Sequence, residues 1–262
     1  MAKRFTREEI KQRFQASIDA GQPIVIASAG IGIAAKFAER GGADMIGLFN
    51  SSYLGLGRVE ATSLMPYGNA NDIVMSLGDR IFPVVQNTPI LGGIIGSDPT
   101  REMTPFLKIM QFKGFPAVIN FPSPGFAYGQ HRRNLERNNY GVQQELKTLR
   151  TAKELGFYTF GLAYDEEIAM QIAADNHDAL VLGLATLEQA AEYINRVSTK
   201  VKAVASEMLI FVQGLPVQTP EDTQYIYDHT DAVGFIGINN MDYGTKPIQD
   251  TVAAFKSAKI HA

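Results

Sequence analysis

Apolar residues along this chain fall into two alternating patterns. Short runs rich in Ile, Val, Leu and Phe lack polar alternation, which is typical of parallel strands covered on both faces. The stretches that follow them repeat their apolar residues with the period of an amphipathic helix. We predict strands at residues 24–29, 45–50, 90–95, 117–121, 158–163, 179–184, 209–213 and 233–238. We predict helices at residues 33–40, 70–81, 101–112, 142–155, 166–174, 187–204, 221–229 and 247–258.

This alternation amounts to eight β/α units in one chain. Eight units predict an α/β fold, a single (β/α)8 TIM barrel that occupies residues 1–262 as one domain. Ahead of the first strand, Thr6 and Glu9 have the spacing of a capping box, and Gly21 is a typical helix stop. We therefore expect an extra N-terminal helix, within residues 1–21, packed on the barrel. A doubly wound open sheet is the main alternative.

The composition of the chain excludes several classes of site and partner. The chain has 262 residues, a net charge of −3 and a pI of about 5.8, so no basic excess indicates a nucleic-acid partner. Cysteine is absent, which excludes disulfides, thiolate nucleophiles and Cys-ligated metal sites. The charged segment MAKRFTREEIKQRF lacks the apolar core of a signal peptide, and no apolar run is long enough to cross a membrane. We expect a cytoplasmic enzyme or binding protein.

Loop length indicates which face of the barrel carries the site. In a (β/α)8 barrel, the strand-to-helix loops share the face on which active sites are found. Two of these loops are long, residues 51–68 and 122–140, whereas connections after helices are as short as Gly41-Gly42. Long loops without structure of their own are uncommon unless they are functional. We therefore expect these two loops to cover the active site.

Polar residues follow the second predicted strand where it ends. Asn50 and Ser52 point into the expected site, and we predict that they hydrogen-bond a reacting carbonyl or enolate. Turn capping is the alternative, but no helix follows at once. Arg58, further along the same loop, would orient an anionic group of the substrate, because the guanidinium fork matches carboxylate and phosphate geometry.

The fourth predicted strand leads into the segment NFPSPGFAYGQHRRNLERNNYG, residues 120–141. Asn120 is a further candidate for hydrogen-bonding the reacting group. Pro122 belongs to the predicted substrate-binding wall, where proline limits movement of the entrance. Arg132 is a candidate anion clamp. For the arginines of this segment, the alternative is a solvated basic surface that pairs with Glu136 or Glu145.

Two acids are candidates for a general base. Asp98 and Asp165 follow the third and fifth predicted strands, which places both on the expected catalytic face. Helix capping is the alternative for each, because Pro99 suits the first position of a helix and the helix dipole favours acids in the first turn. Asp98 is also where a Mg²⁺ ligand would lie.

Glycines at strand ends indicate a binding site for phosphate. The loops after strands seven and eight of such barrels commonly bind phosphate through backbone N–H groups. Here these loops contain Gln213-Gly214 and Gly237 with Asn239. Gly93, at the end of the third strand, is a further candidate substrate contact. We predict that all five residues contact the substrate.

The segment AGIGIAA, residues 29–35, follows a predicted strand and opens a helix. This arrangement is similar to a dinucleotide-binding fingerprint. The acid expected at the end of the next strand is missing, because Asn50 stands there. A tight strand-to-helix turn that requires glycine is the alternative, so an NAD(P)-dependent oxidoreductase is a distant possibility.

Several segments together resemble the phosphoenolpyruvate hydrolase-like TIM-barrel family, which is related to the isocitrate lyase and phosphoenolpyruvate mutase superfamily. They are AAKFAERGGADMIGLFNSS, MPYGNANDIV, TPILGGIIGSDPTREM, INFPSPG with RRNLE and YGVQQEL, and TPEDTQYIYDHTDAVGFIG. The resemblance covers roughly residues 24–238 in the family's order. It implies a TIM barrel, a small anionic substrate and a homo-oligomer.

The chain departs from that family pattern after the last strands. It has VQGLP at residues 212–216, where family members usually carry His-Gly-Gly-Pro. The Asp-x-Asp magnesium motif of the larger superfamily is also absent, so the sequence assigns no cofactor, and Mg²⁺ stays an open alternative. We expect a lyase or hydrolase that acts on a small carboxylate-bearing or phosphorylated substrate through an enolate-like intermediate. A non-catalytic barrel that binds a ligand or a partner subunit is the alternative.

Overall fold

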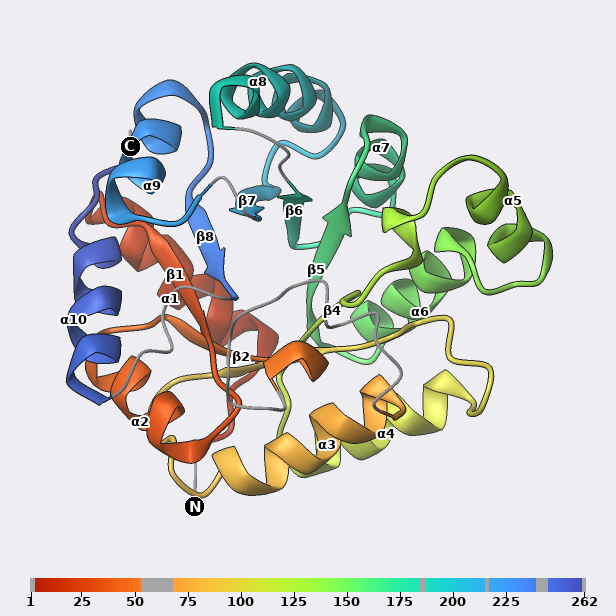
Figure 1. Cartoon of the computed structure of the whole chain (residues 1–262), viewed down its shortest axis with the longest axis horizontal. Helices are drawn as coiled ribbons and strands as arrows, with labels where there is room; N and C mark the ends of the chain where they lie inside the picture. Colours follow the sequence, from red (N-terminus) through yellow and green to blue (C-terminus); the bar gives the residue numbers. More distant parts are fainter. Residues whose placement is uncertain (1–2, 53–67, 184–186, 215–216, 239–244, 261–262) are drawn as a thin grey trace.

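The computed structural model describes residues 3–52, 68–183, 187–214, 217–238 and 245–260; Arg58 and Asn239 lie outside the described residues. Eight parallel strands close into a barrel in chain order (Figure 1). They are β1 (Ile24–Ser28), β2 (Met45–Leu48), β3 (Ile90–Gly93), β4 (Ala117–Ile119), β5 (Tyr158–Ala163), β6 (Ala179–Gly183), β7 (Leu209–Gln213) and β8 (Gly234–Gly237). The barrel closes where β1 pairs with β8, from Ile24 opposite Gly234 to Ala27 opposite Gly237. The predicted TIM barrel is confirmed, and the alternative of an open sheet is wrong.

Helices surround the barrel and follow the strands in sequence (Figure 1). They are α1 (Arg7–Asp19), α2 (Gly32–Arg40), α3 (Ala70–Ile81), α4 (Met103–Lys113), α5 (Gly129–Arg137), α6 (Val142–Glu154), α7 (Glu166–Ala174), α8 (Leu187–Val204), α9 (Pro220–His229) and α10 (Thr245–Lys256). Two 3-10 turns, η1 (Asn50–Ser52) and η3 (Pro124–Phe126), follow β2 and β4. In the part of the chain that the structure describes, no helix has the length and apolar character to span a membrane.

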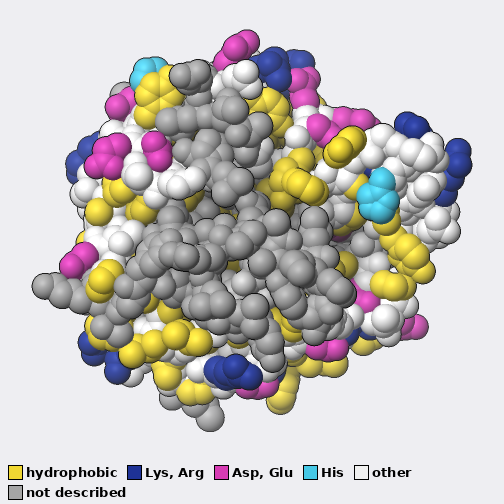
Figure 2. Space-filling model, in the orientation of Figure 1, with side chains coloured by type: hydrophobic (Ala, Val, Ile, Leu, Met, Phe, Trp, Pro, Cys, Tyr) yellow, Lys and Arg dark blue, Asp and Glu magenta, His cyan; other side chains and the backbone are white. Residues whose placement is uncertain are grey.

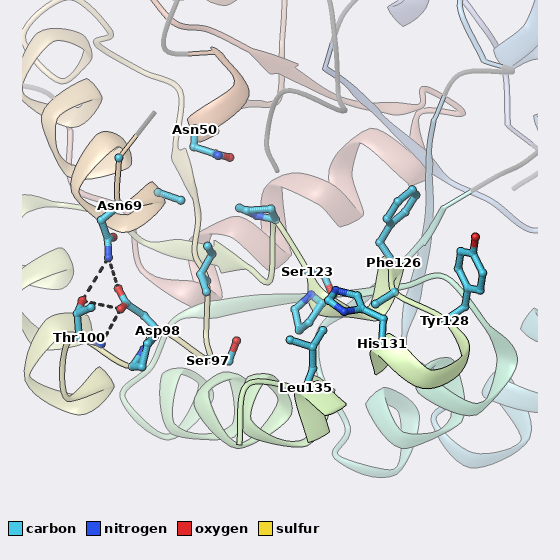
Figure 3. Close-up of a pocket in the computed structure, with 17 residues that line it drawn as sticks. Asn50, Asn69, Ser97, Asp98, Thr100, Ser123, Phe126, Tyr128, His131 and Leu135 are labelled. Atoms are coloured by element: carbon cyan, nitrogen blue, oxygen red, sulfur yellow. Dashed lines mark hydrogen bonds between the residues drawn. The ribbon is translucent and has the colours of Figure 1, made fainter. Parts of the chain in front are cut away.

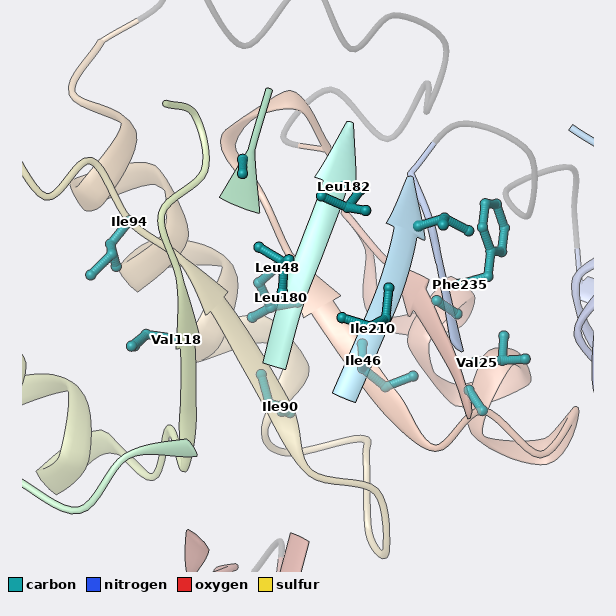
Figure 4. Packing of buried hydrophobic residues seen from close by; sticks show 14 of the residues in the cluster. Val25, Ile46, Leu48, Ile90, Ile94, Val118, Leu180, Leu182, Ile210 and Phe235 are labelled. Carbon is teal, nitrogen blue, oxygen red and sulfur yellow. The ribbon is translucent and has the colours of Figure 1, made fainter. Parts of the chain in front are cut away.

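Apolar side chains form two layers, as the uniformly buried strands predict. One layer lies between strands and helices, where Val25, Ile46 and Val118 pack outward (Figure 4). The other fills the barrel interior and includes Ile26 and Phe160. The alternation follows from the strand period of two, which sends successive side chains to opposite faces. The barrel is therefore a packed core, and room for a ligand has to come from the loops at its ends.

Helix α1 closes the amino-terminal end of the barrel. Phe14 is fully buried and meets the Tyr158 ring edge-on, with ring centroids 5.4 Å apart. Arg7 of the same helix forms a salt bridge to Asp178 at 2.7 Å. The capping box predicted for Thr6 and Glu9 is present. Helix α1 therefore packs across this end of the barrel interior.

The segment after β4 is not the structureless loop that its composition suggests. Residues 122–140 contain η3 and the whole of α5. Helix α5 has no buried residue, so its sequence carries no apolar stripe that would have revealed it. It projects from the barrel at the right of Figure 1.

Candidate functional site

A cavity of about 830 Å³ lies at the carboxyl ends of β2, β3 and β4 (Figure 3). Its walls come from the start of α3, the loop after β3, and the segment from Pro122 to Leu135. The polar residues that line it are Asn50, Asn69, Ser97, Asp98, Thr100, Ser123 and His131. The apolar side is exposed: Phe126 is 60% and Tyr128 86% accessible. Figure 2 shows hydrophobic side chains and a histidine over the part of the molecule that α5 forms.

Asp98 lies in the cavity wall with both carboxylate oxygens saturated. Oδ2 accepts hydrogen bonds from the side-chain amides of Asn69 and Asn71, at 2.8 and 2.9 Å. Oδ1 accepts from the N–H and the hydroxyl of Thr100, at 2.9 and 2.6 Å (Figure 3). Arg101 adds a salt bridge to Oδ2 at 2.6 Å. The carboxylate therefore ties the start of α3 to the loop after β3.

This network keeps Asp98 ionised. Burial by itself raises the pKa of the carboxyl group, but hydrogen bonds from Thr100, Asn69 and Asn71 outweigh burial and hold the pKa far below its usual range. A carboxylate with so low a pKa, and with its lone pairs already occupied, is a weak proton acceptor. The geometry thus favours a positioning role for Asp98 over the predicted role as general base. Helix capping is also wrong for this residue, because α4 begins only at Met103.

Glu145 is a buried carboxyl group directly behind the cavity wall, and the sequence analysis did not select it. Its side chain is completely buried on α6. Ser123, which lines the cavity, donates to Oε2 at 2.8 Å, and the Asn120 amide donates to the same oxygen at 3.1 Å. Gly96 packs on it so closely that an added Cβ would lie 3.1 Å from the Glu145 Cα. Oε1 has no hydrogen-bond partner among the described residues.

Burial raises the pKa of Glu145 to about 8, although the hydrogen bonds from Asn120 and Ser123 act in the opposite direction. Glu136 adds a smaller upward contribution. A carboxyl group whose pKa lies near neutrality is suited to proton transfer. Its position in the first turn of α6 gave no sign of this, since acids there are ordinary.

Asn120 is not among the residues that line the cavity. Its side chain points away from the barrel interior, and its amide nitrogen donates to Leu162 O at 3.1 Å while its carbonyl oxygen accepts from Leu162 N–H at 2.6 Å. The side chain thereby continues the β4–β5 ladder beyond the last backbone pair, Ile119 with Phe160. These hydrogen bonds occupy the polar atoms of the side chain, so the geometry favours a role for Asn120 in holding Glu145 and β5 over the predicted contact with a reacting carbonyl.

Arg132 and Asp165, predicted as anion clamp and general base, pair with each other instead. Asp165 is also the N-cap of α7, where Oδ1 accepts from the Ile168 N–H at 2.8 Å. The two charges therefore neutralise each other and join α5 to the start of α7. Neither residue is among those that line the cavity.

The remaining predicted contacts divide between two sides of the barrel end. Asn50 and Pro122 line the cavity. Ser52 is buried in η1, and its hydroxyl has no hydrogen-bond partner among the described residues. Gly93 faces the interior, where an added Cβ would approach Phe121 O to 2.8 Å, so tight packing accounts for this glycine.

The residues predicted to bind phosphate lie across the barrel end from the cavity. Gln213 ends β7, and Gly237 ends β8. Gly214 has a φ of 127°, which favours glycine. None of the three is among the residues that line the cavity. Among the described residues, no group of three or more His, Cys, Asp or Glu side chains is arranged to hold a metal ion.

Residues 9–258 match the family described as phosphoenolpyruvate hydrolase-like. The match extends from α1 to α10 and covers most of the chain. The chain belongs to the phosphoenolpyruvate hydrolase-like family. The fold and the order of the motifs agree with this assignment.

Curated relatives of this phosphoenolpyruvate hydrolase-like chain have names from different areas of biology. The "ToMV susceptible protein tm-1(GCR26)" of Solanum lycopersicum is 32% identical over 260 residues, which are 94% of this chain and 34% of the relative. The "Putative transcriptional regulatory protein y4pA" of Sinorhizobium fredii is 29% identical over 96% of this chain and 44% of the relative. The chain thus spans between about a third and a half of these relatives.

A solved structure described as "Native KDPGal structure" has a TM-score of 0.51 and 16% sequence identity to this family member, over 88% of this chain and 91% of the other. At this identity the likeness concerns the fold alone. It agrees with the closed barrel described above.

Proposed function

We propose that this barrel is an enzyme that acts on a small carboxylate-bearing or phosphorylated substrate, as a lyase or hydrolase, in the cavity beside β2–β4. The observation that carries the proposal is the position of Ser97 and Ser123 in the wall of this cavity, with Glu145 buried directly behind Ser123. Two hydroxyl groups line a space of about 830 Å³, and a carboxyl group with a pKa of about 8 is hydrogen-bonded to one of them. Such a space is within the usual range for small-molecule sites.

The proposed chemistry is stabilisation of an enolate-like oxygen by fixed donors. The hydroxyls of Ser97 and Ser123 and the amide of Asn50 supply donors from three different strand ends. Donors that are fixed before the reaction stabilise developing negative charge without reorganisation. No step requires a metal ion, and Mg²⁺ remains a candidate cofactor.

Phosphoenolpyruvate is the first substrate to test, because it carries both a carboxylate and a phosphate. Incubation with the protein would release pyruvate and inorganic phosphate, which phosphorus and proton NMR detect together. We expect turnover by the wild type and a loss of at least about tenfold in the Ser97→Ala, Ser123→Ala double variant. Equal activity of wild type and variant would contradict the proposed site. Absence of turnover and of any melting-temperature shift would contradict the proposed substrate.

A non-catalytic binding barrel is the second candidate. It is favoured by the commitment of Asp98, Arg132 and Asp165 to hydrogen bonds and ion pairs within the chain. The names of relatives, which refer to virus susceptibility and transcriptional regulation, do not mention a reaction. A ligand at 100 times its Kd would still stabilise such a barrel by about 2.7 kcal/mol. Stabilisation by phosphoenolpyruvate without turnover would favour this candidate.

A further inference from the structure

Ser123 connects the buried Glu145 with the cavity. Ser123 lines the cavity and is 5% accessible, whereas Glu145 is not accessible at all. The Ser123 Oγ and the Glu145 Oε2 are 2.8 Å apart. The Gly125 N–H donates to the same Oγ at 2.9 Å. The Ser123 hydroxyl therefore lies between the Glu145 carboxyl group and the cavity.

The direction in which the Ser123 hydroxyl hydrogen points depends on whether Glu145 is protonated. A hydroxyl has one hydrogen and two lone pairs, and its hydrogen turns to suit its partners. One lone pair of Ser123 accepts from Gly125. If Glu145 is a carboxylate, the Ser123 hydrogen points at Oε2 and is unavailable to the cavity. If Glu145 is protonated on Oε2, that oxygen still accepts from Asn120, Oε2–H donates to the second lone pair of Ser123, and the Ser123 hydrogen is free to point into the cavity.

We propose that Glu145 is a positioning residue that is protonated at neutral pH and so sets Ser123 as a hydrogen-bond donor to a carboxylate, phosphate or carbonyl oxygen in the cavity. The class of ligand rests on the proposed function. The donor state of Ser123 does not, because it follows from contacts within the chain. Ionisation of Glu145 turns the donor away, and the cavity loses affinity for acceptor-rich ligands.

The surroundings of Glu145 support the protonated form. Full burial raises its pKa to about 8. Glu136, from α5, is the charged neighbour that contributes to this shift, and it also disfavours a second negative charge. The neighbours from the other packed elements are uncharged: Asn120 and Ser123 after β4, and Gly96 after β3. The unpartnered Oε1 is costly for a carboxylate and much less so for a neutral carboxyl group.

Calorimetric titration with phosphoenolpyruvate between about pH 6.5 and about pH 9.5 tests the proposal, with Glu145→Gln as the matched variant. In the wild type, affinity should fall as the pH rises through the pKa of Glu145 and level off near the affinity of Ser123→Ala, because only the protonated fraction presents the donor. In Glu145→Gln the Asn120 N–H faces the former Oε2 position, so the Gln carbonyl oxygen takes that position and accepts the Ser123 hydrogen at every pH. Glu145→Gln should therefore bind weakly without a pH dependence. Ser123→Ala should bind weakly at every pH. An equal pH dependence in wild type and Glu145→Gln would overturn the proposal.

Infrared difference spectra of wild type against Glu145→Gln separate this inference from the proposed function, since they need no ligand. We expect the C=O band of a protonated carboxyl group at neutral pH, its loss as the pH rises through about 8, and its displacement in Ser123→Ala. If phosphoenolpyruvate fails to bind at any pH, the proposed substrate fails and the spectra decide the inference. Absence of the band at neutral pH, or a band that Ser123→Ala leaves in place, would overturn it.

Discussion

The Arg132 guanidinium pairs with the Asp165 carboxylate, so α5 is joined to the start of α7 by two residues of opposite charge. Asp165 also caps α7 through the Ile168 N–H. A charge that is already neutralised within the chain gives little to a substrate anion. The pair accounts for both residues as parts of the scaffold that holds α5 beside the cavity.

Asp165→Ala should lower the free energy of unfolding by about 1 kcal/mol, because α7 loses its N-cap. Asp165→Ser keeps a capping oxygen and loses only the ion pair, so its cost should stay below about 1 kcal/mol, as for other solvent-accessible pairs. Urea denaturation measures both changes. Arg132→Ala should leave the affinity for phosphoenolpyruvate unchanged, and a tenfold loss would show that Arg132 contacts the ligand after all.

Asp98→Asn should lower the free energy of unfolding by about 3 kcal/mol, because it removes one partner of a buried charge pair and places an amide against the donors of Asn69 and Asn71. Asp72→Asn is the matched control, since Asp72 also pairs with Arg101 but its side chain is 69% exposed. The control should cost less than about 1 kcal/mol. Similar losses in both variants would contradict the network described for Asp98.

The pH dependence of the Asp98 contribution has a definite sign. Because the folded-state pKa is depressed, the contribution is complete above the ordinary Asp pKa of about 4 and is lost as the pH falls below that value. The difference in stability between wild type and Asp98→Asn should therefore shrink in acid. A difference that stays constant down to about pH 2 would count against an ionised Asp98 as its source.

His177 should make the protein sensitive to acid. It is buried, its Nδ1 lies 3.0 Å from the Thr159 hydroxyl, and its Nε2 lies 3.9 Å from Asp175. Burial lowers its pKa to about 4, against an upward effect of Asp175 and Asp178. The neutral ring is favoured in the folded state, so stability is retained above about pH 6.5 and lost as the pH falls toward about 4.

His177→Gln should remove part of that acid sensitivity, on the order of 3 kcal/mol between about pH 7 and about pH 4. The exposed His229 offers the control variant His229→Gln, which should retain the wild-type pH profile. Thermal melting across this pH range measures the effect. Parallel profiles for wild type and His177→Gln would show that His177 does not become charged on unfolding.

The architecture was predictable because each strand is buried on both faces. The run from Leu209 to Gln213, for example, is unbroken by polar residues until its last position, and β7 has those bounds. Helix α5 was not predictable in the same way, because packing buries none of its residues. A helix is predicted from the periodic spacing of the apolar residues that it buries, and an exposed helix such as α5 has no such spacing.

The sequence predicted where in the fold the candidate site lies better than it predicted which residues form the site. Asn50, Pro122 and Asp98 line the cavity, as expected for residues after neighbouring strands. Glu145 was missed because its burial depends on Gly96 and Asn120, which lie far away in the sequence and meet it only through the barrel. The ion pair between Arg132 and Asp165 could not be predicted from the sequence either, because it depends on the direction in which α5 leaves the barrel.

A crystal structure of the protein soaked with phosphoenolpyruvate tests the central claim most directly. We predict density for the ligand in the cavity of about 830 Å³, with an acceptor oxygen within hydrogen-bond distance of the Ser123 hydroxyl and a second near Ser97. Ligand density at the ends of β7 and β8, beside Gln213 and Gly237, with an empty cavity at Ser123, would contradict the account.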